Sequence, residues 1–85
     1  MQEAEESGIG AKKVTEYAEE LAKMGSFSKL NTQELTELSL SMQQLAKDTE
    51  LNVDDIANYT NELMKLDEFE GESAETVAQF ATAVL

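Results

Sequence analysis

Apolar residues recur along this chain with a step of 21 residues, and four copies of the pattern align without a gap. The first column holds Val14, Leu35, Ile56 and Val77. Three positions later come Tyr17, Leu38, Tyr59 and Phe80, and four beyond those come Leu21, Met42, Leu63 and Val84. Met24, Leu45 and Leu66 end the unit. Steps of three and four place these residues on one helix face, so the repeat predicts one helical unit used four times, with neighbouring units covering one another.

Each copy also carries a helix start signal in one shared column, which holds Gly10, Asn31, Asn52 and Ser73. Asparagine and serine side chains accept hydrogen bonds from the free N–H groups of a first helical turn. Three residues later, Glu34 completes a capping box with Asn31, and we expect Asp55 to form a weaker box with Asn52.

The chain is therefore predicted to be all-α, with four short helices near residues 11–24, 32–47, 53–66 and 74–85. They are expected to form a compact helical array or bundle in a single domain over residues 1–85, with residues 1–10 flexible or fraying. Gly25 and Gly71 lie in the first and third joins, whereas the middle join, residues 47–51, has neither glycine nor proline. Phe27 and Phe69 share a column within the loops and are expected to cover the core, with a partner contact as the alternative.

An extended coiled coil is the alternative fold, because a step of 21 residues equals three heptads. In an unbroken helix, polar seam positions would be occupied by Ser28, Asn31, Thr49, Asn52, Glu70 and Ser73. Gly25 and Gly71 would each cost about 1 kcal/mol in that helix. These polar positions and glycines favour the compact array for the isolated chain.

The net charge of the chain limits the classes of partner that it is expected to bind. The chain has 85 residues, with six lysines, no arginine and 18 acidic residues, and its net charge is -12. Direct binding to nucleic acid is not expected, since phosphate neutralisation needs clustered basic residues, and an anionic membrane is disfavoured for the same reason. The apolar residues never approach the ~18 consecutive positions that a membrane span requires. The acidic residues suit either a solvated surface or a basic partner.

Groups that carry out chemistry are scarce. The sequence contains no histidine, cysteine or arginine, and these supply the usual base at neutral pH, the thiolate nucleophile and common metal ligands. The adjacent acidic pairs, Glu19 with Glu20 and Asp54 with Asp55, point to different sides of a helix. The segment Asp-Glu-Phe-Glu-Gly at residues 67–71 lacks the ligand spacing of a calcium loop. We therefore predict no catalytic, cofactor-binding or metal-binding residue, no cofactor and no enzymatic activity.

Residues 6–85 resemble the helical region of bacteriophage tail tape measure proteins. The likeness lies in Ser-Gly-Ile-Gly-Ala-Lys-Lys-Val at residues 7–14, Leu-Ala-Lys-Met-Gly at residues 21–25, and Leu-Ala-Lys-Asp-Thr-Glu-Leu-Asn-Val-Asp-Asp-Ile-Ala at residues 45–57. The family often has glycine where this chain has Glu50. The resemblance implies a fragment of a longer structural protein that acts in tail assembly and sets tail length. It also implies tail tube proteins and tail assembly chaperones as partners, and a location in the virion tail and, during assembly, in the host cytoplasm.

Two other functions stay open. A generic helical interaction or scaffold module would share every feature above. An acyl carrier domain has a similar size and charge, but it carries Asp-Ser-Leu at the start of its second helix, where this chain has Asn31-Thr32-Gln33. We also expect Phe80, Val84 and Leu85 to be partly uncovered or paired with another copy in a homo-oligomer.

Overall fold

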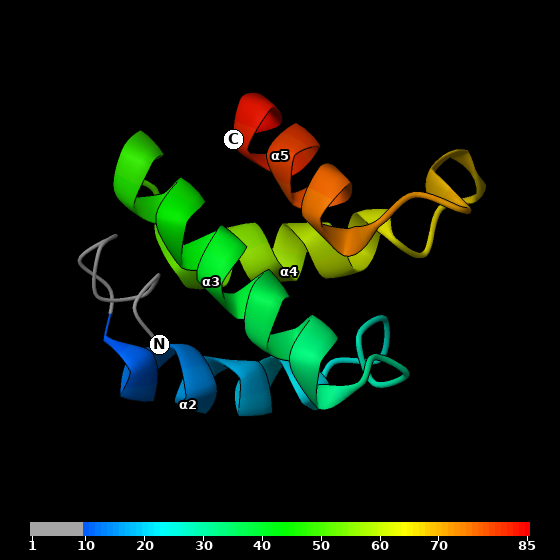
Figure 1. Cartoon of the computed structure of the whole chain (residues 1–85). Helices are drawn as coiled ribbons and strands as arrows, with labels where there is room; N and C mark the ends of the chain where they lie inside the picture. The colour runs from blue at the N-terminus through cyan, green and yellow to red at the C-terminus, as the bar shows by residue number, and fades with distance from the viewer. Residues whose placement is uncertain (1–9) are drawn as a thin grey trace.

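The structure is a computed structural model that describes residues 10–85, and in this range four α-helices form a compact all-α array (Figure 1). The helices are α2 (Ala11–Ala22), α3 (Thr32–Thr49), α4 (Val53–Leu63) and α5 (Ala74–Val84), and a 3₁₀ turn, η1 (Asp67–Phe69), precedes α5. Helix α3 packs against each of the other three helices, and α5 also packs against α4. The predicted compact array is confirmed, and its Cα radius of gyration, 11.9 Å, agrees with the value of about 12 Å expected for a folded domain of this length.

The column that begins with Gly10 supplies the N-cap residue of each of the four α-helices, as predicted: Gly10, Asn31, Asn52 and Ser73. Asn31 and Glu34 form the predicted capping box, in which the Glu34 N–H donates to Asn31 Oδ1 over 2.8 Å and the Asn31 N–H donates to Glu34 Oε1 over 3.0 Å. Ser73 accepts from the Thr76 N–H over 3.2 Å. The weaker box predicted at Asn52 is wrong. Asn52 Oδ1 instead accepts from the Asp54 N–H, one residue earlier than predicted.

Helix ends differ from the predicted ends by one to three residues, for two physical reasons. After Ala22 and after Leu63 the chain tightens into turns with hydrogen bonds to the carbonyl three residues back. The Met24 N–H donates to the Leu21 carbonyl, and the Leu66 N–H donates to the Leu63 carbonyl. Helix α3 instead runs to Thr49, two residues beyond its predicted end, and ends where Glu50 adopts a left-handed conformation (φ 61°, ψ 20°). The middle join is therefore shorter than predicted.

The first apolar column is buried in every unit, since Val14, Leu35, Ile56 and Val77 are each at most 9% exposed. Phe27 is fully buried in the main cluster beside Leu21, Leu38 and Met42, which confirms its predicted role as core cover. Phe69 is half-buried in a second cluster with Leu63, Val77 and Ala81. The repeat thus supplies one core element per unit.

A second buried column follows the same 21-residue step but consists of small residues: Ala18, Ser39, Thr60 and Ala81. Small side chains let neighbouring helices approach closely. The Ser39 hydroxyl reaches across to α2 and donates to the Val14 carbonyl over 2.7 Å. The Thr60 hydroxyl donates within its own helix to the Ile56 carbonyl, also over 2.7 Å. Because both hydroxyls are paired, the column can be buried without leaving an unsatisfied group there.

Hydrogen bonds link α2 and the loop that follows it to both ends of α4. The Tyr17 hydroxyl donates to Asp54 Oδ1 over 3.0 Å and lies 3.3 Å from the Val53 carbonyl, at the start of α4. Near the end of α4, the Ser26 N–H donates to Asn61 Oδ1 over 3.1 Å, and the Ser26 hydroxyl donates to the Asn61 carbonyl over 2.9 Å. These long-range bonds fix where α4 lies relative to α2. Residues 1–9 and the flexibility predicted for them lie outside the described residues, whereas Gly10 directly precedes α2.

Candidate functional site

The adjacent carboxylates remain separate surface groups. Glu19 and Glu20 are both exposed on α2, and Glu20 pairs with Lys23 over 3.2 Å. Asp54 accepts the Tyr17 hydroxyl, while Asp55 is exposed one residue further along α4. Within residues 10–85, no group of three or more acidic side chains is arranged to hold a metal ion.

Tyr17 is the side chain whose titration is most clearly altered in the described part of the chain. Burial raises its pKa first, and the hydrogen bond to the Asp54 carboxylate raises the pKa further, because both disfavour the charged phenolate. A nucleophile or base would need the opposite shift at neutral pH. The bond therefore acts as a structural link between α2 and α4.

A polar cluster is buried between α2 and α3. Gln43 is 5% exposed, and its Nε2 donates to the Lys13 carbonyl and to the Ser39 hydroxyl, each over 3.3 Å. Its Oε1 is buried and has no hydrogen-bond partner among the groups that the structure describes. The amide therefore joins the two helices while leaving one acceptor unsatisfied, a cost of about 1–3 kcal/mol.

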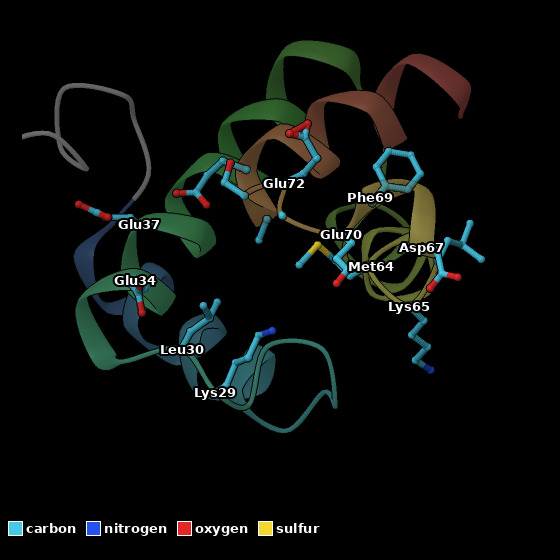
Figure 2. A pocket seen from close by; sticks show the side chains of 15 residues that line it. Lys29, Leu30, Glu34, Glu37, Met64, Lys65, Asp67, Phe69, Glu70 and Glu72 are labelled. Atoms are coloured by element: carbon cyan, nitrogen blue, oxygen red, sulfur yellow. The ribbon is translucent and has the colours of Figure 1, made fainter.

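A groove of about 580 Å³ lies between the start of α3, the segment around η1 and the start of α5. Figure 2 shows Lys29, Leu30 and Glu34 along one side, and Met64 and Phe69 along the other. Six carboxylates line the groove with two lysines: Glu34, Glu37, Asp67, Glu70, Glu72 and Glu75, with Lys29 and Lys65. One carboxylate, Glu34, is already held in the capping box. The groove is thus an acidic hollow without a converging set of reactive groups.

The outer face of α5 is the most apolar exposed surface of the described helices. Phe80, Val84 and Leu85 are 47%, 55% and 51% exposed, as predicted for these three residues. The Phe80 ring lies against Phe69, with ring centroids 5.1 Å apart and planes tilted by 59°. We call Phe80, Val84 and Leu85 the α5 patch. Apolar patches of this kind commonly mark interaction surfaces.

Comparison of this chain with protein-family models, curated proteins and solved structures found no match. A separate observation concerns membranes: among the helices that the structure describes, each is too short or too polar to cross a bilayer.

Sequence reasoning identified the apolar columns and the α5 patch but missed the buried polar groups. Ser39 and Thr60 share a column with Ala18 and Ala81, so aligning small residues as well as apolar ones on the 21-residue step would have identified them. Gln43 lies in a column with Ala22, Met64 and Leu85. One glutamine in an otherwise apolar column is a signal that could have marked the buried cluster. The acidic groove has no comparable signal, because its residues come from two stretches that are far apart in the sequence, 29–37 and 64–75.

Proposed function

We propose that this chain is a structural segment of a bacteriophage tail tape measure protein, acting in tail assembly and in setting tail length. The observation that supports this most is the correspondence between repeat and structure. Each 21-residue unit forms one helix, and the first column of every unit is buried. A chain of this kind repeats one packing unit, so its length increases by a fixed amount with each added unit.

In this proposal the compact array is the form of the isolated segment, and an extended helical form arises in the tail. The apolar columns keep steps of three and four across all four units, so one unbroken helix would present them as a continuous seam. Straightening requires three joins to become helical. Straightening removes the left-handed backbone conformation of Glu50. It also places Gly71, which has a φ of 88° in the compact array, inside a helix. Partner chains would have to cover the columns that the compact fold now buries.

The proposed partners are tail tube proteins and tail assembly chaperones, and the proposed location is the virion tail and, during assembly, the host cytoplasm. These follow from the resemblance of residues 7–14, 21–25 and 45–57 to the family. The role proposed for the segment is structural and not enzymatic.

An in-frame deletion of one unit, residues 32–52, in the gene that encodes this chain tests the proposal. A 21-residue helical segment spans about 32 Å, so electron micrographs should show tails shortened by that amount. Deleting 14 residues should shorten tails by about 21 Å, two thirds as much. Mass spectrometry of purified virions should detect peptides of the chain. Unchanged tail length, or particles that lack these peptides, would overturn the proposal.

A generic helical interaction module is the second candidate, and the α5 patch favours it because a free apolar face suits docking. An acyl carrier finds less support. Ser73, the one serine at a helix start within residues 10–85, caps α5 and donates its hydroxyl to Thr76 Oγ1 over 2.9 Å. Treatment with a phosphopantetheinyl transferase followed by intact-mass analysis should show no added group.

A further inference from the structure

The acidic groove has an apolar floor, formed by Leu30, Met64, Leu66 and Phe69. Leu30 packs against the main hydrophobic cluster, Phe69 packs against the second, and Met64 packs against both. In Figure 2 the Leu30 and Met64 side chains extend into the groove from opposite sides. Leu66 is 47% exposed. The groove therefore continues the core to the surface and offers contacts for large apolar side chains of a partner.

The sides of the groove carry excess negative charge. Six carboxylates and two lysines line it, so the net charge of the lining is -4. One of the lysines, Lys65, already pairs over 3.0 Å with Glu62, which lies outside the groove. Glu34 is held in the capping box. Within residues 10–85 the other five carboxylates form no ion pair: Glu37, Asp67, Glu70, Glu72 and Glu75. The groove can therefore accept several cations from a partner.

The groove also includes the starts of two helices, which could in principle favour an anion instead. Both starts are already capped, α3 by Asn31 and α5 by Ser73. Glu34 and Glu75 place carboxylates in the first turns of these helices, where they interact favourably with the helix dipole. An anionic ligand would add to the negative charge of the lining. Charge complementarity therefore favours a basic partner.

We propose that the acidic groove binds a basic amphipathic helix of another protein. The apolar face of that helix contacts the floor, and its lysine or arginine side chains pair with the carboxylates at the sides. The groove volume of about 580 Å³ lies within the range of about 300–1,000 Å³ that is typical of ligand pockets. Residues 10–85 contain no strand with which an extended peptide could pair, so a helix in a groove is the mode of recognition that fits. This site does not depend on a role in phage tails.

Isothermal titration calorimetry with a synthetic peptide tests the proposal. The probe is a helical peptide of about 14 residues that contains only leucine and lysine, with the leucines spaced to form one face. The wild type should bind one peptide per chain, and added salt should weaken binding because it screens the charges. A peptide with serine in place of leucine has the same charge but no apolar face. It should bind at least about tenfold more weakly.

Two double variants separate the charge of the groove from the net charge of the chain. Glu70→Lys combined with Glu72→Lys reverses two exposed charges of the groove and should raise the dissociation constant at least about tenfold. Glu16→Lys combined with Glu19→Lys makes the same change in net charge at exposed positions of α2, outside the groove. This control should raise the dissociation constant less than about threefold.

Two further variants test the apolar floor. Leu66→Ser should raise the dissociation constant at least about tenfold, because it removes an apolar contact from the groove. Val84→Ser is the matched control, since Val84 is 55% exposed but belongs to the α5 patch, and this variant should bind like the wild type. Circular dichroism should show that every variant keeps the helicity of the wild type.

Three results would overturn the proposal. The first is no binding of the leucine–lysine peptide at roughly 1 mM. The second is an equal effect of the two double variants, which would show that the net charge of the chain alone attracts the peptide. The third is a loss of affinity in Val84→Ser as large as that in Leu66→Ser, which would place the peptide on the α5 patch.

Discussion

Replacement of Glu50 by glycine should stabilise the domain and should distinguish the compact array from an unbroken helix. Glu50 is the one non-glycine residue with positive φ among residues 10–85, and it ends α3 in the left-handed region. A residue with a Cβ costs about 1–2 kcal/mol in this conformation. Glycine removes that cost but loses about 0.5–1 kcal/mol through the greater freedom of the unfolded chain.

The charge of Glu50 contributes a separate effect. A carboxylate at a helix C-terminus opposes the helix dipole by about 0.3–1 kcal/mol. Glu50→Ala removes the charge and keeps the Cβ, so it isolates this contribution. We expect Glu50→Gly to exceed Glu50→Ala in stability by about 0.5–1 kcal/mol, which corresponds to a rise of roughly 2–8 °C in Tm for a domain of this size.

The assay is urea unfolding followed by far-ultraviolet circular dichroism, with Glu50→Ala as the matched control. The sign of the difference between the two variants decides the outcome. In an unbroken helix, glycine at position 50 would be less stable than alanine by about 1 kcal/mol. Glu50→Gly at or below the stability of Glu50→Ala would therefore refute the left-handed end of α3 and the break between α3 and α4.

Three further predictions concern other parts of the fold. Gly71→Ala should destabilise the domain by about 1 kcal/mol because Gly71 has a φ of 88°, whereas Gly25→Ala, at a glycine without positive φ, should be neutral or slightly stabilising in the same urea titration. Phe27→Ala should lower the free energy of unfolding by about 3–5 kcal/mol, since the ring is fully buried, and a loss below 1 kcal/mol in urea unfolding would contradict its place in the core. Stability should also fall at alkaline pH. The pKa of Tyr17 is raised in the folded state, so its contribution is complete below the unfolded pKa of about 10 and is lost as pH rises above that value. Thermal unfolding between pH 8 and about 11 should therefore show a steeper loss in the wild type than in Tyr17→Phe, and equal slopes would contradict the burial of the Tyr17 hydroxyl and its bond to Asp54.

The central parts of the fold were predictable because they depend on periodicity. Helical spacing identified Val14, Leu35, Ile56 and Val77, and burial of all four follows from the need to cover one face of each helix. The capping box at Asn31 was predictable for a similar reason, since it depends on two residues three positions apart. Patterns of this kind involve only residues of one helix, so they can be recognised from the sequence alone.

Features that depend on contacts between helices were not predictable in the same way. The end of α3 at Glu50 follows from packing that turns the chain into α4, against the local preference of glutamate for a right-handed helix. The buried Gln43 is held by the Lys13 carbonyl of another helix, which its own neighbours in sequence do not indicate. The acidic groove arises only when α3 and α5 start close together around η1. The shortage of reactive groups, by contrast, was visible from composition alone.

Small-angle X-ray scattering, extrapolated to infinite dilution, tests the central claim most directly. The account predicts a compact particle with a radius of gyration close to the 11.9 Å of the Cα atoms. An unbroken helix over residues 10–85 would be a rod roughly 110 Å long with a radius of gyration of roughly 30 Å, from a rise of 1.5 Å per residue. A value near that of the rod would contradict the claim that the 21-residue repeat folds into a compact array of four helices.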